Sequence, residues 1–234
     1  MSNLTADQGT SPVIAPANNA RTLSALGLML IRGSRCLFRD LSLSVNGGEA
    51  LLLRGANGSG KTSLLRVLAG FTKPDEGEVL WNNRPLAPLG SVARHLLLYV
   101  GHANAIKDDL TTIENLAESL ALDDVVAAKR TPEALAAALD SVGLLTRRSL
   151  HARKLSQGQK RRIGLARLLL VDKPVWLLDE PTNALDTDGV NLFTDIINSH
   201  LKRGGLVCIA SHLSIPLGGV VHEMNLDAHW DTTA

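Results

Sequence analysis

The sequence predicts an α/β protein built around a mostly parallel β-sheet. Three observations lead to this prediction. Apolar runs typical of buried strands alternate with segments of helical composition, a glycine-rich segment joins one such strand to one such helix, and a second apolar strand ends in two acidic residues. Alternating strands and helices favour a sheet whose strands run in the same direction.

The expected elements follow the hydrophobic pattern along the chain. Strands are predicted at 26–32, 41–45, 50–53, 77–81, 96–100, 175–178 and 206–210, and helices at 63–69 and 191–201. Between about Thr111 and Ser156 the pattern becomes helical, which inserts helices between two α/β halves. Glu114 follows Thr111 by three residues as in a capping box, and Pro132 suits the first position of a second helix.

Composition limits the function classes. The 234 residues carry a net charge of +1, so no global charge draws the chain to nucleic acid or anionic lipid. No apolar run approaches the ~20 residues that span a bilayer, and no signal peptide is evident, so a cytoplasmic protein is expected. Residues 1–21 are predicted to be a disordered tail. Cys36 and Cys208 are expected to be buried, inert thiols.

The glycine-rich segment has the G-x-x-x-x-G-K-T pattern of a phosphate-binding loop, or Walker A motif. Its glycines let successive backbone N–H groups point at phosphate oxygens, and the following helix adds its positive end. Lys61 is expected to reach the β- and γ-phosphates and to act in catalysis, and the Thr62 hydroxyl is a suitable Mg²⁺ ligand. The predicted ATP-binding residues of this loop are Gly55, Ala56, Asn57, Gly58, Ser59, Gly60, Lys61, Thr62 and Ser63.

The two acids that end the strand at 175–178 are Asp179 and Glu180, which match a Walker B motif. A carboxylate at a strand end can hold Mg²⁺, and Asp179 is the predicted second metal ligand. Glu180 is placed one residue further on, where it can orient or deprotonate the attacking water.

A third motif, Leu155-Ser156-Gln157-Gly158-Gln159, resembles the signature sequence L-S-G-G-Q of the ATP-binding cassette (ABC) ATPases, with Gln157 in place of the first glycine. Ser156 is expected to cap a helix whose free N–H groups face an anion. The resemblance implies that Ser156 and Gly158 contact the γ-phosphate of an ATP held by a second copy of the cassette, and that Gln159 and Asp186 belong to the same nucleotide-binding set.

Two further positions match this family. Asp186 falls in the segment Asn183-Ala184-Leu185-Asp186, which resembles the D-loop at the dimer seam, and His212 resembles the catalytic switch histidine that contacts the γ-phosphate. The resemblance covers residues from about 23 to 221. It implies a P-loop NTPase of the ABC type over residues 22–228, with a parallel sheet core, an antiparallel β subdomain and a helical subdomain at about 103–157. ATP and Mg²⁺ are the implied cofactors.

The chain departs from the general family at two places. His102 stands where a glutamine normally ends the Q-loop, and an imidazole suits softer metals than Mg²⁺. We therefore expect His102 to act through water or through a transporter contact. Arg32 lies in the region of the aromatic residue that usually stacks on adenine, and its planar guanidinium offers an alternative platform.

The segments 98–102, 106–107 and 110–116, together with Arg161 and Arg162, resemble the ATP-binding subunits of cytochrome c biogenesis systems. This resemblance implies a haem-related translocase ATPase at the cytoplasmic face of the bacterial inner membrane. It would be peripheral and paired with an integral membrane subunit of the CcmB type. The sequence leaves open whether hydrolysis exports haem or releases it from a periplasmic chaperone. No C-x-x-C-H motif is present, so direct haem binding is not expected.

Two alternatives stay open at this point. An ATPase subunit for another solute would be expected to carry glutamine at position 102, and a non-transport ABC protein would usually carry two cassettes or a long coiled coil. A basic run could suggest nucleic acid, but we interpret it as a solvated helix face with no nucleic-acid role. Its members are Arg147, Arg148, Arg153, Lys154, Lys160, Arg161 and Arg162.

Overall fold

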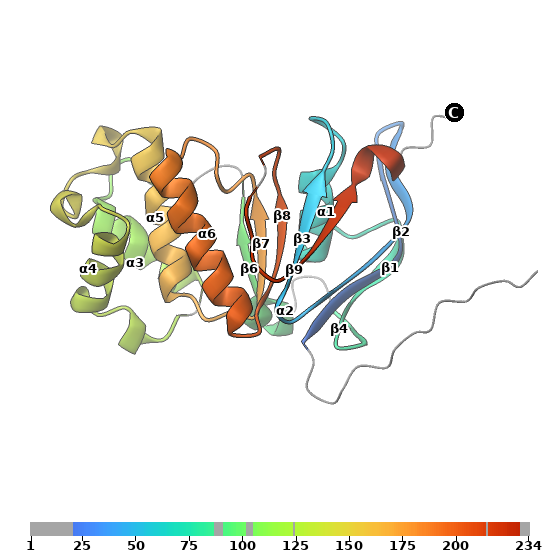
Figure 1. Cartoon of the computed structure of the whole chain (residues 1–234), viewed down its shortest axis with the longest axis horizontal. Helices are drawn as coiled ribbons and strands as arrows, with labels where there is room; N and C mark the ends of the chain where they lie inside the picture. The colour runs from blue at the N-terminus through green and yellow to red at the C-terminus, as the bar shows by residue number, and fades with distance from the viewer. Residues whose placement is uncertain (1–20, 87–90, 102–104, 124, 214, 230–234) are drawn as a thin grey trace, which may run out of the picture.

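The structure, a computed structural model, describes residues 21–86, 91–101, 105–123, 125–213 and 215–229. The central sheet has five strands. Figure 1 shows this sheet in the middle, with helices α5 and α6 on one side and a second sheet on the other. The strands are β1 (Thr22–Arg32), β2 (Arg35–Asn46), β3 (Glu49–Arg54), β4 (Glu76–Trp81), β5 (Arg84–Pro85), β6 (Leu97–Val100), β7 (Val175–Asp179), β8 (Leu206–Ala210) and β9 (Val220–Asn225). The α-helices are α1 (Lys61–Leu68), α2 (Ser91–Leu96), α3 (Thr112–Leu122), α4 (Pro132–Ser141), α5 (Gln157–Leu170) and α6 (Thr187–Lys202).

The central sheet has the order β6-β7-β8-β3-β9, and all of its strand pairs are parallel. It is covered on both faces, which explains why β3, β7 and β8 are continuous apolar runs. Alternate residues of one strand pack into two different hydrophobic clusters, one on each face of the sheet. Leu52 and Trp176 face the helices α5 and α6, whereas Leu51 and Leu177 face α1 and the second sheet. The predicted parallel core is confirmed.

The second sheet is antiparallel, with the order β2-β1-β4-β5. It packs against α1 and the central sheet through a cluster that includes the fully buried side chains of Leu23, Phe38 and Leu65. This sheet lies beside the phosphate-binding loop, because Leu37 and Phe38 sit 3.5 to 3.6 Å from where a Cβ on Gly60 would be. The antiparallel part that the resemblance implied is therefore present.

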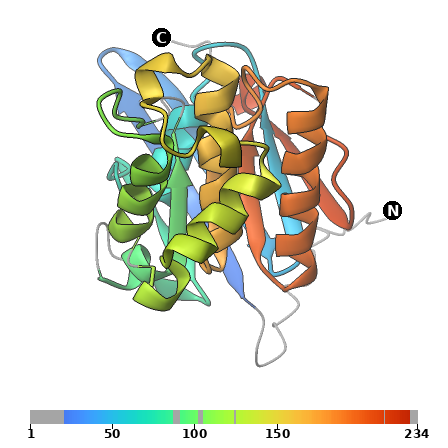
Figure 2. The ribbon, with the colours of Figure 1, turned by 90° about the vertical axis from the view of Figure 1, so that its left-hand side faces the viewer.

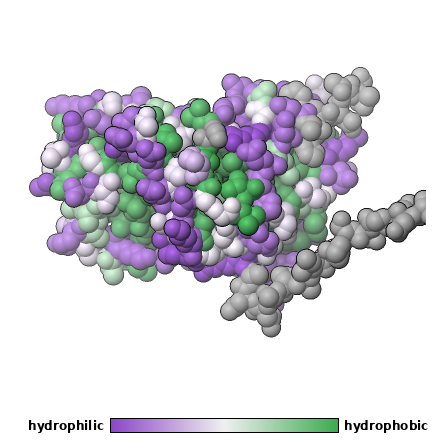
Figure 3. Space-filling view, in the orientation of Figure 1, coloured by the Kyte–Doolittle hydropathy of each residue, from purple (hydrophilic) through white to green (hydrophobic). Residues whose placement is uncertain are grey.

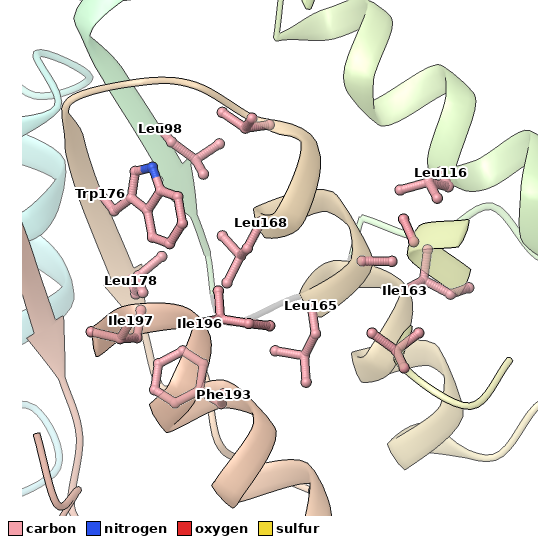
Figure 4. Packing of buried hydrophobic residues seen from close by; sticks show 14 of the residues in the cluster. Leu98, Leu116, Ile163, Leu165, Leu168, Trp176, Leu178, Phe193, Ile196 and Ile197 are labelled. Carbon is pink, nitrogen blue, oxygen red and sulfur yellow. The ribbon is translucent and has the colours of Figure 1, made fainter. Parts of the chain in front are cut away.

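The helical part begins with two capped helices. Thr111 and Glu114 form the predicted capping box of α3, and Thr131 caps α4 with Pro132 in its first turn. Figure 2, which looks onto this end, shows α3 and α4 in front of α5. In Figure 4, α5 lies between the sheet and α3, with Leu165 and Leu168 facing Phe193 and Trp176 and Ile163 facing Leu116. Helix α5 thus connects the helical part to the central sheet.

Several elements differ from expectation. Strand β9 and helix α2 were not predicted, and α6 begins at Thr187 rather than at 191 because Asp186 caps it through the Gly189 N–H. Strand β9 is an edge strand with no fully buried residue, so its sequence lacks a clear pattern. The prediction that Cys36 is buried is wrong, since it is only half-buried, whereas Cys208 is buried and its pKa is raised to about 12 by that burial.

Figure 3 shows hydrophilic residues over most of the same face, with hydrophobic residues gathered near its middle over the central strands. Among the described helices, none has both the length and the apolar composition needed to cross a bilayer. Of the predicted tail at 1–21, only residue 21 belongs to the described residues. His102 also lies outside the described residues.

Candidate nucleotide site

The phosphate-binding loop connects β3 to α1, as the motif predicts. Gly55 has a φ of 133° and Gly60 a φ of 99°, values that favour glycine, and a Cβ on Gly55 would lie 2.6 Å from the Ser59 hydroxyl. The loop therefore requires glycine at both positions for its tight turn. Lys61 is buried, and its ammonium donates to the carbonyls of Gly55 (2.7 Å) and Ala56 (3.0 Å).

The two predicted metal ligands lie together. The Thr62 hydroxyl donates to the Asp179 carboxylate, whose oxygens lie 3.1 and 2.9 Å away, although the two residues are 117 positions apart. Strand β7 ends at Asp179 next to β8, and this places the carboxylate beside the start of α1. These are hard oxygen donors with room for water, which fit Mg²⁺ delivered with a nucleotide.

Glu180 and His212 complete this cluster. The Nε2 atom of His212 lies 3.2 Å from the Glu180 carboxylate, 2.8 Å from the Asn57 side-chain oxygen and 3.4 Å from the Lys61 ammonium. Glu180 is buried, whereas His212 is exposed. A cleft of about 580 Å³ opens over these groups, lined by Arg32, Leu37, Asn57, Gly58, Gly60, Lys61, Thr62, Ser63, Asp179, Glu180, Asn183 and His212.

The signature residues lie in a different cleft, of about 420 Å³. Ser156 caps α5 as predicted: its hydroxyl accepts the Gln159 N–H, and the Gln159 side chain accepts the Ser156 N–H. Gly158 is tightly packed, because a Cβ there would lie 2.8 Å from the Ala184 carbonyl oxygen. Ser156, Gly158, Gln159 and Asp186 share this cleft, and none of them lines the cleft around Lys61.

Asp186, which lines the second cleft, accepts hydrogen bonds from helices α5 and α6. Its carboxylate accepts from the Arg162 guanidinium at 2.7 Å and from the Gly189 N–H at 2.9 Å. These hydrogen bonds, that of Arg162 first, hold the pKa of Asp186 below its usual value. The structure therefore divides the predicted site residues into two half-sites on one chain.

The interpretation of the basic run as a solvated face is wrong for Arg161. Arg147, Arg148, Arg153 and Lys154 are exposed, but Arg161 is 5% exposed and donates to backbone carbonyls of residues 179, 180 and 181. Burial lowers the pKa of Arg161, while Asp179 and Glu180 raise it. Its spacing gave a signal: positions 161, 165 and 168 fall on one helix face, and Leu165 and Leu168 are buried.

Two further residues, which lie outside every sequence motif, hold the backbone of the site. Arg54 at the end of β3 donates to the carbonyls of Ser211 (3.0 Å) and Leu213 (2.7 Å), which flank His212. Asp227, in the short 3₁₀ helix after β9, accepts the N–H of Ala56. Nothing in the local sequence marks either residue, because each acts on a segment more than 150 positions away.

The fold is that of a P-loop ATPase, and the predicted nucleotide-binding residues lie in two clefts of one chain. The comparisons with known proteins agree with this class of fold. The chain belongs to the ABC transporter family, whose model matches residues 38–183, and it is an ATPase that binds ATP.

Within the ABC transporter family, the chain is similar to the ATP-binding protein CcmA. The chain is 46% identical over 205 residues to the cytochrome c biogenesis ATP-binding export protein CcmA of Nitrosomonas europaea, covering 87% of this chain and 95% of that protein. It is also 46% identical over 195 residues to CcmA of Pseudomonas aeruginosa, with 83% and 95% covered.

Solved structures share the fold. A protein assigned as an ABC transporter ATP-binding protein from Pyrococcus furiosus has a TM-score of 0.76 and 25% identity, covering 90% of this chain and all of that chain. A dimeric, post-hydrolysis ATP-binding cassette bound to ADP and Pi has a TM-score of 0.71 and 24% identity, covering 82% and 88%.

Proposed function

We propose that this chain supplies ATP hydrolysis to a membrane complex that exports or delivers haem for the maturation of c-type cytochromes. The 46% identity to a cytochrome c biogenesis ATP-binding export protein over 87% of the chain carries this proposal. The chain would act as a peripheral subunit on the cytoplasmic face of the bacterial inner membrane, beside an integral membrane subunit of the CcmB type.

Two copies of the chain would form the working unit. The cleft around Lys61 offers groups for phosphates but lacks the signature residues, and the cleft around Ser156 offers a capped helix start without a phosphate-binding loop. Two cassettes facing each other would bring the loop of one copy against Ser156 and Gly158 of the other. ATP would then be held between the copies, and Asp186 would lie near the seam.

In the hydrolytic step, Lys61 leaves the carbonyls of Gly55 and Ala56 and binds the β- and γ-phosphates. Glu180 orients a water molecule and accepts its proton as the water oxygen attacks the γ-phosphorus and the bond to ADP breaks. His212 contacts the γ-phosphate. When bound with the nucleotide, Mg²⁺ would be held by Thr62 and Asp179 and would offset phosphate charge.

A second surface fits the membrane subunit. A mostly apolar cavity of about 380 Å³ lies between the end of β6, the segment at 105–107 and helices α3 and α5, with Tyr99, Ile106, Leu122 and Ile163 in its lining. Leu122 is 76% exposed and Val126, just beyond it, is 62% exposed. We propose that a segment of the membrane subunit docks here, next to the Q-loop.

Deletion of the gene in the host, followed by an assay of covalent haem in periplasmic c-type cytochromes, tests the cellular function. We expect the cytochromes to be lost and to return when the intact gene is supplied, but not when it carries Lys61→Ala. Normal cytochromes in the deletion strain would remove the haem assignment and leave the ATPase intact. Co-purification with an integral membrane protein separates a transporter subunit of any kind from a soluble ABC protein.

A further inference from the structure

Three consecutive basic residues at the start of α5 reach three different parts of the molecule. Lys160 pairs with Asp108 in the segment before α3, and Arg162 donates to Asp186 and to the Val142 carbonyl at the end of α4. Arg161, between them, points into the protein and reaches the end of β7. The N-terminal part of α5 thus contacts several parts of the molecule, and its buried arginine contacts the backbone around Glu180.

The contacts of Arg161 fall on three successive carbonyls. Its Nε atom donates to the Pro181 carbonyl at 3.0 Å, and one terminal nitrogen contacts the carbonyls of Asp179 (3.4 Å) and Glu180. A planar guanidinium has fixed donor directions, so several carbonyls held at once define the path of this backbone better than a single bond would. Arg161 is 5% exposed, and water therefore competes little for these donors.

The backbone that Arg161 holds is an unusual one. Glu180 has a φ of 48°, in the left-handed region that is unfavourable for a residue other than glycine. Such a conformation persists only when its surroundings impose it. Here the Glu180 N–H donates to the Ala210 carbonyl of β8 at 2.9 Å, and the Glu180 carbonyl accepts from Arg161. The backbone is thus held on both sides of the carboxylate.

We propose that Arg161 is a positioning residue for Glu180, which fixes the residue 179–181 backbone and so directs the carboxylate at the attacking water. Arg161 lies five residues after Ser156 on the same capped helix. A phosphate bound at Ser156 therefore acts on the helix that holds the acid of the other site. This inference rests on the proposed role of Glu180 in hydrolysis.

The test compares Arg161→Lys, which keeps the charge but loses the fork of donors, with the intact ATPase. We expect the turnover number to fall by about 10- to 100-fold, as for a misplaced catalytic group. The Kd of a fluorescent ATP analogue should change by less than about threefold, because Arg161 lines neither of the two half-site clefts. If the lysine variant does not fold, Arg161→Gln is the second variant. Its neutral amide avoids leaving a buried charge without hydrogen-bond partners.

The matched control is Arg167→Lys on the same helix. Arg167 pairs with Asp123 at 2.6 and 2.8 Å, so its substitution also removes a forked, part-buried contact, but away from the two half-sites. It should lower the melting temperature and leave the turnover of the folded protein unchanged. An equal loss of turnover in both variants would show that general destabilisation is the cause, and would overturn the proposal.

Single-turnover rates of Glu180→Gln, Arg161→Lys and the double variant complete the test. If Arg161 acts through Glu180, the double variant should be no slower than Glu180→Gln alone. If the rate reductions of the two single variants multiply in the double variant, Arg161 acts independently of Glu180 and the proposal is overturned. Wild-type turnover in Arg161→Lys would overturn the positioning role of Arg161 and leave the role of Glu180 intact. A full rate in Glu180→Gln would instead remove the assignment of Glu180 and the inference with it.

Discussion

Asp227 accepts the backbone N–H of Ala56 with both of its carboxylate oxygens, which lie 3.0 and 3.1 Å from that nitrogen. The two residues are 171 positions apart, and the contact ties the C-terminal end of the described chain to the phosphate-binding loop. Its consequence is that the loop is not held by its own glycines alone. A charged acceptor outside the motif fixes the position of the second residue of the loop.

Replacing this acceptor should weaken nucleotide binding. In Asp227→Ala the loop loses one charge-assisted hydrogen bond, for which a cost of about 1 kcal/mol predicts a roughly fivefold rise in the KM for ATP. The turnover number should change less, because Glu180 and Thr62 do not contact Asp227. Steady-state ATPase kinetics measure both quantities. Asp227→Asn, which keeps an acceptor, should show a smaller effect.

The control for this prediction lies on the neighbouring strand β9. The His222 ring pairs with the Glu49 carboxylate at 3.2 Å, at the start of β3 and away from the loop, so His222→Gln should leave the KM unchanged. A KM in Asp227→Ala equal to that of the intact protein would show that the loop holds its shape without the C-terminal contact.

Lys61→Ala should abolish productive ATP binding. Lys61 carries the one cationic side chain of the loop. It is also the only lysine among the described residues that line the cleft. Binding of a fluorescent ATP analogue and ATPase assays should both fall to background, while circular dichroism should stay that of a folded protein. A Lys61→Ala variant that hydrolyses ATP at the normal rate would show that the phosphate-binding loop is wrongly assigned.

Glu180→Gln should trap the ATP-bound pair of cassettes. The amide keeps the size of the side chain and cannot accept the proton of the attacking water, so ATP stays between the two half-sites. Light scattering after gel filtration should give twice the monomer mass with ATP and Mg²⁺ and a monomer with ADP. Ser156→Arg, which fills the signature cleft, should prevent this dimer. A monomeric Glu180→Gln protein in the presence of ATP would contradict the two-copy arrangement.

Much of the site could be predicted from sequence because its chemistry is local. Gly55–Thr62, Asp179–Glu180 and the Ser156 cap are each set by neighbouring residues, and the order of strands and helices brings the first two together. The helix spacing of Arg161 indicates that it is buried, but its partners, like those of Arg54 and Asp227, could not be found in this way. Each donates to or accepts from a backbone group whose position depends on the tertiary fold, and a backbone carbonyl has no sequence signature.

The same reasoning explains which elements were missed. The strands β3, β7 and β8 are buried on both faces and appear as continuous apolar runs, so they were predicted within a residue or two. Among the described strands, β9 pairs with β3 alone, at the edge of the sheet, and its mostly exposed residues show no hydrophobic period. The start of α6 was placed four residues late, because the Asp186 side chain supplies the cap before the apolar periodicity begins.

The pH dependence of stability should reflect a buried histidine outside the site. His200 on α6 is 5% exposed, stacks on Trp176 with ring centroids 3.8 Å apart, and donates through Nε2 to the Leu206 carbonyl at 3.3 Å. Burial lowers its pKa from 6.5 to about 4. Between these two values the unfolded chain binds a proton that the folded chain does not, so acid favours unfolding. The free energy of unfolding should therefore fall by up to about 1.4 kcal/mol per pH unit from this residue as the pH drops from about 6.5 to about 4.

His200→Gln isolates this contribution, since glutamine can also donate to Leu206 but carries no charge at any pH. Urea unfolding of both proteins between pH 7 and pH 4 gives the comparison, and carboxylates that titrate in the same range contribute equally to both. The variant should be less stable at pH 7, because it loses the stacking on Trp176, and its stability should decline less steeply with acid. Parallel declines in the two proteins would mean that folding leaves the pKa of His200 unchanged, despite the close packing of Gly205 against its ring.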